Sequence, residues 1–131
     1  GRGSDGVGMV PTTLIAATAV GGAAGSVLRL LLTRLPFVNG SVLMVCAINV
    51  LGSLLLGLFW AVLASRGGSP LAWNALGVGL LGGFTTYSTY SLDIFRMIEV
   101  GRWPAALAYA LGTAVAAVAG CAVGVAWGRS I

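Results

Sequence analysis

The chain has 131 residues, enough for one ordinary domain, and 58% of them are hydrophobic. Only 8% are charged, whereas a soluble domain usually carries about 25%. Because so few charges cannot cover the surface of a water-soluble domain, the composition excludes a soluble globular protein. The net charge of +4 comes from single arginines scattered between apolar stretches, so it indicates a membrane rather than nucleic acid.

Four apolar stretches predict an all-α membrane protein with four transmembrane helices, because about 20 helical residues cross the hydrocarbon core. We expect a flexible tail over residues 1–11, a single domain over 12–128, and helices over 12–33, 41–64, 72–98 and 103–127. The first stretch lacks a preceding basic run, so we expect a retained helix and not a signal peptide. The short connections leave no room for an extramembrane catalytic domain.

The arginines do not define a single orientation in the membrane. Four spans place Arg2, Arg66 and Arg129 on one side, and Arg34, Arg96 and Arg102 on the other, with Arg29 near the second side. The positive-inside rule requires an excess on one side. Two interpretations remain open: a weaker cue selects one orientation, or the chain inserts both ways and pairs with an inverted copy.

Small residues recur every four positions on several of these stretches. The rows are Gly21 and Gly25, Gly79 and Gly83, and Ala108, Gly112, Ala116, Gly120, Gly124 and Gly128. Small residues allow helix backbones to approach closely in lipid. The rows therefore predict tight helix packing, within or between subunits.

The third stretch contains an unusual polar segment. Gly82 and Gly83 precede seven consecutive hydroxyl-bearing residues, Thr85 to Ser91. The glycine pair lies about 15 Å of helical rise from Trp73, near the membrane midplane. We expect a helix break over residues 82–86, and irregular backbone at this depth is tolerated only within protein or beside a water-filled cavity.

A break of this kind suggests two binding functions. Carbonyl oxygens released from helical pairing can coordinate a hard cation such as Na⁺. Tyr87 and Tyr90, three residues apart on one helical face, can present positively polarised ring edges to an anion. The alternative is a Ser- and Thr-rich kink that packs against neighbouring helices.

Three other positions carry polar groups suited to an anion, each with an alternative. The Asn49 amide can donate to an anion or bond to a neighbouring helix. Tyr109 and Thr113 share one face of the fourth stretch, where their hydroxyls can line a path or bond to their own helix. Arg29 can attract anions to a vestibule or extend to lipid headgroups.

Several functions are excluded by what the spans lack. The middle of each span contains no Asp, Glu, Lys or His, although proton-coupled transport normally requires an ionisable relay there. The chain also has no Walker motif, no HExxH and no paired nucleophile and base. We therefore expect a protein that is not an enzyme.

The segment from Gly82 to Ser91 (GGFTTYSTYS) resembles the third-helix signature of the Fluc-type (CrcB) fluoride channels. Gly21, Gly22 and Gly25 with Arg29, Asn49 with Gly52 and Gly57, and Tyr109 with Thr113 extend the resemblance from about Thr12 to Trp127. The resemblance implies an antiparallel, dual-topology dimer in the cell (inner or plasma) membrane. Such a dimer passively exports cytoplasmic fluoride.

The resemblance also implies roles for individual residues. The backbone carbonyls of Gly82 and Thr85 match the ligands of a structural Na⁺ at the dimer centre, and Arg29 matches a vestibule residue. The residues implied to line the pore or bind the anion are Asn49, Thr86, Tyr87, Ser88, Thr89, Tyr90, Tyr109 and Thr113. Tyr87 and Tyr90 replace two pore phenylalanines, and Ala117 stands where another Ser or Thr is expected.

The sequence leaves some alternatives open. The partner is either an identical copy or a homologous second subunit. A small dual-topology drug or cation exporter has a similar length, but it requires a membrane carboxylate that residues 12–28 lack. A non-transporting assembly subunit is a third possibility, against which the hydroxyl run argues.

Overall fold

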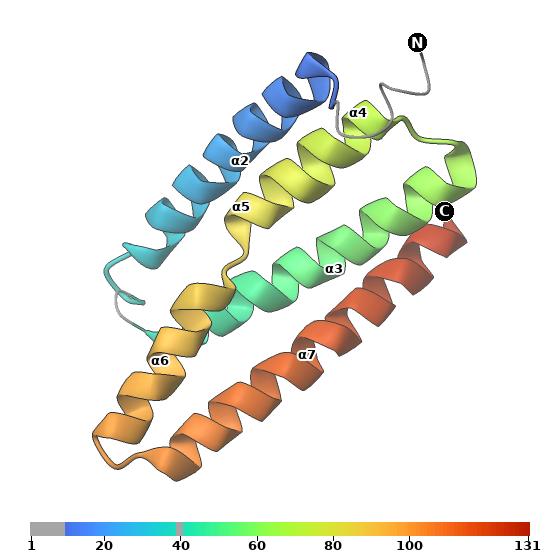
Figure 1. Ribbon diagram of the computed structural model, residues 1–131. Helices are drawn as coiled ribbons and strands as arrows, with labels where there is room; N and C mark the ends of the chain where they lie inside the picture. The colour runs from blue at the N-terminus through green and yellow to red at the C-terminus, as the bar shows by residue number, and fades with distance from the viewer. Residues whose placement is uncertain (1–9, 39–40) are drawn as a thin grey trace.

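The computed structural model describes residues 10–38 and 41–131, and within this part of the chain the regular structure is helical (Figure 1). Of the expected N-terminal tail, residues 1–9 lie outside the described part. The helices in chain order are α2 (Thr12–Thr33), α3 (Val42–Arg66), α4 (Pro70–Ala72), η1 (Trp73–Leu81), α5 (Gly82–Phe84), α6 (Tyr87–Glu99) and α7 (Trp103–Ser130).

In the described part of the chain, three helices, α2, α3 and α7, are long and apolar enough to cross a membrane. The third apolar stretch forms a bent element: α4, η1 and α5 follow one another without a gap, and α6 continues after a break. The prediction of an all-helical protein with an interrupted third stretch is confirmed.

Local sequence signals set the helix boundaries. The Ser41 hydroxyl accepts a hydrogen bond from the Leu43 amide (3.1 Å) at the start of α3, and the Ser69 hydroxyl accepts one from the Ala72 amide (3.1 Å) at the start of α4. Helix α3 ends at Arg66 and is followed by Gly67, whose φ of 67° lies in the left-handed region that glycine adopts at low cost. These signals place a short turn between α3 and α4.

The helices pack as two groups that the bent element connects. Helix α3 packs along α7, whereas α2 packs against η1 and α5. After the break, α6 leaves α2 and packs against α7, as Figure 1 shows. The bent element therefore changes its packing partner at the break.

Glycines permit the closest of these contacts. A Cβ at Gly124 of α7 would overlap the Leu54 carbonyl of α3, and a Cβ at Gly25 of α2 would overlap the Leu80 carbonyl of η1. Gly112 differs from Gly124, because a Cβ there would meet nothing within 4 Å. The small-residue row of α7 thus packs on α3 in its C-terminal half and is open at Gly112.

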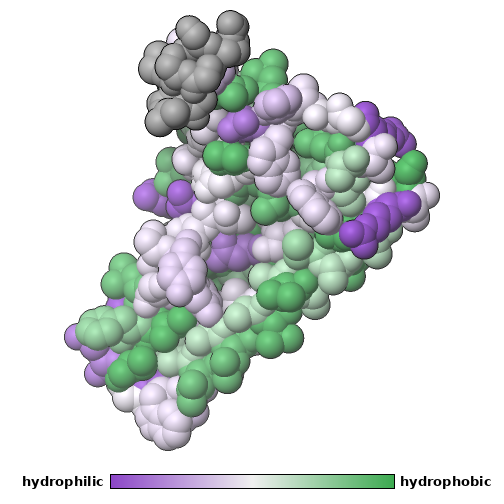
Figure 2. All heavy atoms as spheres, turned by 45° about the vertical axis from the view of Figure 1, so that its right-hand side comes forward, coloured by the Kyte–Doolittle hydropathy of each residue, from purple (hydrophilic) through white to green (hydrophobic). Residues whose placement is uncertain are grey.

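The chain buries a small core and exposes much apolar surface. Ile48, Leu81 and Phe84 form the buried cluster, whereas residues such as Val20 (72% exposed) and Val115 (68%) point outward. Figure 2 shows hydrophobic residues over much of one face, with a hydrophilic patch recessed near its middle. An apolar surface of this extent suits lipid or another protein subunit.

We expect Gly124→Ala to destabilise the protein by about 1 to 3 kcal/mol, because the added methyl group overlaps the backbone of α3. Gly112→Ala is the matched control on the same helix and should be neutral or stabilising by up to about 1 kcal/mol. Thermal unfolding in detergent, followed by tryptophan fluorescence, measures both. Equal unfolding temperatures for the two variants would contradict this packing.

Candidate functional site

The site is centred on the helix break, which is shorter than expected. Only Thr85 (φ −83°, ψ 156°) and Thr86 (φ −146°, ψ 124°) are extended, whereas Gly82–Phe84 form the helical turn α5. Before the turn, η1 is a π-helix, a widened form that occurs frequently at functional sites. The structure therefore narrows the break from residues 82–86 to two threonines.

The glycine pair does not itself interrupt the helix. A Cβ at Gly83 would overlap the Gly22 carbonyl of α2, so this glycine permits close packing. The Thr86 hydroxyl instead begins α6 by accepting a hydrogen bond from the Thr89 amide (3.3 Å). Gly83 brings α5 close to α2, and Thr86 starts the next helix.

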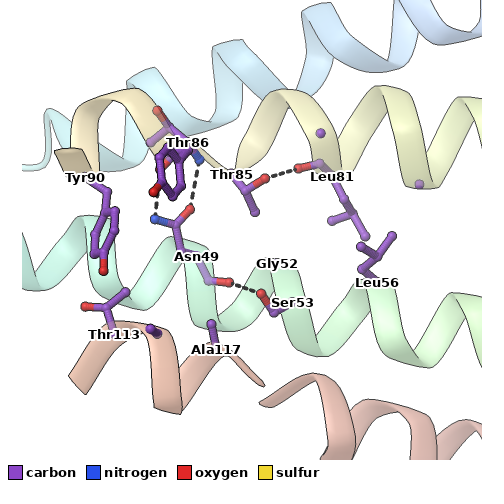
Figure 3. A pocket seen from close by; sticks show the side chains of 14 residues that line it. Asn49, Gly52, Ser53, Leu56, Leu81, Thr85, Thr86, Tyr90, Thr113 and Ala117 are labelled. Carbon is purple, nitrogen blue, oxygen red and sulfur yellow. Dashed lines mark hydrogen bonds between the residues drawn. The ribbon is translucent and has the colours of Figure 1, made fainter. Parts of the chain in front are cut away.

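The Asn49 side chain of α3 holds the extended backbone through two reciprocal hydrogen bonds (Figure 3). Its Nδ2 donates to the Thr86 carbonyl (3.0 Å), and the Thr86 amide donates to its Oδ1 (2.8 Å). Of the two roles expected for Asn49, the interhelical hydrogen bond is present. We call this pair of bonds the Asn49 clamp.

The clamp and the cap of α6 change the pairing of two nearby carbonyl groups. Because the Thr86 amide donates to Asn49, it does not donate to the Gly82 carbonyl four residues earlier. Because the Thr89 amide donates to the Thr86 hydroxyl, it does not donate to the Thr85 carbonyl. Both predicted cation ligands have thus lost their usual helical donors.

Arg29 lies beside the break. Its Nε donates to the Gly83 carbonyl (3.2 Å), and the Ser26 hydroxyl lies 3.5 Å from the same oxygen. The cationic side chain therefore sits at the C-terminal end of the α5 turn, where helical carbonyls carry partial negative charge. The contact joins the half-buried Arg29 side chain to the backbone just before the break.

A cavity of about 430 Å³ lies on one side of the clamp, between the bent element, α3 and α7. None of its lining residues carries a charge. Its polar lining residues are Asn49, Ser53, Thr85, Thr86, Tyr87, Tyr90 and Thr113, and Gly82 and Ala117 also contribute. Figure 3 shows these side chains converging from the three elements.

A second cavity of about 280 Å³ has a different character. Arg29, Arg34, Arg96 and Asp93 contribute to its lining, together with hydroxyl groups that include Thr89. Thr86 lines both cavities. The clamped backbone therefore separates a cationic cavity from an uncharged one.

The predicted aromatic residues form a row with three different environments. Tyr87 is 80% exposed, and its ring centroid lies 5.7 Å from that of Tyr90. The Tyr90 ring lies 5.4 Å from the buried Tyr109. Tyr109 does not line the larger cavity; its hydroxyl donates to the Asp93 carboxylate (3.4 Å).

Ser88 and Thr113, two further residues predicted to line the pore, lie in different environments. Ser88 is exposed, outside both cavities, with its hydroxyl 3.4 Å from that of Thr86. Thr113 is 5% exposed and lines the larger cavity, and its Oγ1 has no hydrogen-bond partner among the described residues. The expected alternative, a hydroxyl bonded to its own helix, is therefore not observed for Thr113.

Ser53 and Asp93 are site residues that were not predicted from the sequence. Ser53 follows Asn49 by four residues, so helical spacing places both on the cavity face. Asp93 follows Tyr90 by three residues, which places it on the same face of α6. The helical spacing of Ser53 from Asn49, and of Asp93 from Tyr90, is the sequence feature that could have predicted them.

Together, the fold and the site define a multi-pass helical membrane protein with a polar cavity at a broken helix. A family model described as "CrcB-like protein, Camphor Resistance (CrcB)" matches residues 16–125, and the chain belongs to this family.

Curated relatives carry the name "Fluoride-specific ion channel FluC". The protein of Nitrobacter winogradskyi is 41% identical over 123 residues (86% of this chain, 93% of the relative). That of Novosphingobium aromaticivorans is 40% identical over 124 residues (91% and 98%). That of Methylobacterium nodulans is 50% identical over 74 residues (56% and 60%). The expectation that the chain is not an enzyme agrees with these relatives, which are named as channels.

We expect Asn49→Ala to destabilise the protein, because it leaves the Thr86 amide and carbonyl without partners. Each unsatisfied buried polar group costs about 1 to 3 kcal/mol. Ser53→Ala is the matched control, since the Ser53 hydroxyl donates to the Asn49 carbonyl of its own helix (2.7 Å). Thermal unfolding should separate the variants, and equal stability would show that the clamp does not hold the break.

Proposed function

We propose that this protein is a fluoride-selective passive channel that lets cytoplasmic F⁻ leave the cell. The names of the curated relatives support this function. The structural observation that carries it is the uncharged cavity at the break, where the buried Thr113 hydroxyl has no partner among the described residues. A hydroxyl donor is a suitable partner for a partly dehydrated F⁻.

The two cavities suggest how an anion is handled. Arginine side chains in the smaller cavity attract anions and raise their local concentration. Neutral donors in the larger cavity then replace part of the hydration shell without binding so tightly that release becomes slow. Thr113 and the second N–H of the Asn49 amide are the donors that we assign to this step, with the Tyr87 and Tyr90 rings beside them. The Thr86 amide and hydroxyl already donate to Asn49 and Thr89.

The driving force is the electrochemical gradient of fluoride. In an acidic medium, neutral HF enters the cell and dissociates in the less acidic cytoplasm. An inside-negative potential then favours F⁻ exit by about 2.3 kcal/mol per 100 mV. The channel requires no other energy source.

Liposomes containing the purified protein should release F⁻ much faster than Cl⁻ without a proton gradient. Thr113→Val removes the hydroxyl at nearly constant volume and should lower F⁻ release about tenfold, the scale of one hydrogen bond to a charged group. Thr18→Val is the control, because the Thr18 hydroxyl bonds to the Leu14 carbonyl within α2 (2.7 Å). Equal F⁻ and Cl⁻ rates, or a strict requirement for a pH gradient, would contradict the channel.

A drug or cation exporter is the alternative function. Such an exporter needs a membrane carboxylate on its first helix, and α2 (Thr12–Thr33) contains none. The same liposomes, loaded with an organic cation and given a proton gradient, should show no cation efflux.

We also propose that two chains assemble as an antiparallel, dual-topology dimer. The balanced arginines and the large exposed apolar surface support this arrangement. A cysteine introduced at Val100, in a chain with Cys46 and Cys121 replaced by Ala, should react with impermeant reagents from both membrane faces. Labelling from one face alone, in the absence of a second homologous chain, would overturn the proposal.

A structural Na⁺ at the centre of this dimer is the third proposal. The Gly82 and Thr85 carbonyls fit this role, because their helical donors are engaged elsewhere. Among the described residues no cluster of three His, Cys, Asp or Glu side chains forms a metal site. Neutral carbonyl ligands favour a monovalent ion over Mg²⁺ or Ca²⁺.

Na⁺ should raise the unfolding temperature of the dimer relative to a bulky organic cation. Thr85→Ser should retain this dependence, since the ligand is the backbone. Gly82→Leu should abolish it: within one chain a Cβ at Gly82 meets nothing closer than the Gly77 oxygen at 3.8 Å, so crowding comes from the second subunit. If the unmodified protein has the same unfolding temperature in Na⁺ and in the organic cation, the proposal of a Na⁺ site is wrong.

A further inference from the structure

The C-terminal ends of α3 and α7 lie side by side at one end of the molecule (Figure 1). A Cβ at Gly128 of α7 would lie 2.7 Å from the Ala61 side chain and 2.8 Å from the Leu58 carbonyl of α3, so the two helices pack closely near their last turns. Helix α3 ends at Arg66, and Arg129 lies in the last turn of α7. The fold therefore brings two arginines from different helices to the same end of the bundle.

Each of these arginines contacts the other helix or the residue that follows it. The Arg129 guanidinium of α7 lies over the Trp60 ring of α3, with its Cζ 5.8 Å from the ring centroid. Nη2 of Arg66 donates to the carbonyl of Ile131, the residue after α7 (2.9 Å). A cation–π contact and a hydrogen bond restrict the two side chains. Both guanidinium groups are thus held in position by the protein itself.

These contacts leave most of the guanidinium N–H donors available. A guanidinium that lies over an aromatic ring uses its face, so its five N–H groups point outward in the plane. Among the described residues Arg129 has no hydrogen-bond acceptor, Arg66 uses one donor, and both side chains are exposed. A planar fork of free donors binds a phosphate group through two parallel hydrogen bonds.

The charge at this end of the molecule favours an anionic ligand. In the part of the chain that the structure describes, the acidic side chains are Asp93 and Glu99, both on α6. Helix α6 leads into the start of α7, and the 28 residues of α7 separate its two ends by about 42 Å. These carboxylates therefore do not neutralise Arg66 and Arg129.

Tryptophans at the same end indicate where the ligand comes from. Trp60 of α3 and Trp127 of α7 are 49% and 51% exposed. Tryptophan is enriched at membrane–water interfaces, where its ring lies at the level of the lipid headgroups. A phosphate within reach of a guanidinium that lies over Trp60 is therefore the phosphate of a lipid headgroup.

We propose that Arg129, held over Trp60, and the neighbouring Arg66 bind the headgroup phosphate of an anionic phospholipid. We call these three residues the Arg–Trp site. The inference does not depend on the proposed function. In the proposed antiparallel dimer, one such site faces each leaflet of the membrane.

The test uses the full-length protein in liposomes of brominated phosphatidylglycerol, which is anionic, mixed with brominated or unbrominated phosphatidylcholine, which is zwitterionic. Bromine quenches tryptophan fluorescence at short range, and comparison with Trp60→Phe isolates the Trp60 signal. Varying the lipid ratio gives the relative affinity of the two headgroups. Arg129→Gln and Arg66→Gln each remove one charge from the site. Arg102→Gln, at the start of α7, is the control that removes one exposed charge from the opposite end.

We expect phosphatidylglycerol to be preferred near Trp60 by about tenfold in the unmodified protein. Arg129→Gln and Arg66→Gln should each lower this preference about fivefold, the scale of one basic residue near an anionic surface. Arg129→Lys, which keeps the charge without the planar fork, should give an intermediate preference. Arg102→Gln should retain the full preference.

Three results would overturn the inference. Equal affinity for the two headgroups in the unmodified protein would show that the site does not select an anionic lipid. An equal loss of preference in Arg102→Gln and Arg129→Gln would show an effect of net charge alone. If excess inorganic phosphate at matched ionic strength removes the preference, the ligand is a free phosphate ion and not a lipid.

Discussion

The arrangement of the site depends on the two hydrogen bonds between the Asn49 side chain and the backbone of Thr86. An extended segment inside a membrane exposes amide and carbonyl groups that lipid cannot satisfy. The Asn49 amide supplies one donor and one acceptor in the geometry of a backbone partner. One side chain on an unbroken helix thereby makes a helix break tolerable at this depth.

The clamp has consequences on both sides of the break. On the N-terminal side it engages the Thr86 amide, which leaves the Gly82 carbonyl without its helical donor. On the C-terminal side α6 starts again at Tyr87, no longer beside α2. It approaches α7, where Tyr90 and Tyr109 provide the bonds between the two helices. The break thus creates the freed carbonyls, the cavity and the change of packing partner together.

The two cavities on either side of the clamp differ in charge. Arg29, Arg34 and Arg96 line the smaller cavity, and Arg29 also donates to the Gly83 carbonyl at the end of the α5 turn. The larger cavity contains neutral donors and aromatic rings. A fully charged cavity would hold an anion tightly, and a purely apolar one would exclude it. Neutral donors provide an intermediate interaction that suits passage of a small anion.

The sequence by itself determined the helical class, the bent third stretch and the types of polar residue available at its centre. These follow from local properties: apolar length, small-residue spacing and a run of hydroxyls that lipid alone cannot accommodate. The resemblance of residues 82–91 to a family signature added the family itself, to which residues 16–125 match.

Only the tertiary structure decided which partner each polar group meets. Tyr87 and Tyr90 belong to the same run of hydroxyl residues and lie on one face of α6. The Tyr90 hydroxyl nevertheless bonds to Ala110, whereas Tyr87 is exposed. The glycine pair was expected to interrupt the helix, but both glycines lie in the α5 turn, Gly83 permits close packing on α2, and the break begins at Thr85. Such outcomes depend on residues distant in the chain, which the local sequence does not specify. Asn49 and Thr86 are 37 positions apart, and they meet only because α3 and the bent element pack side by side.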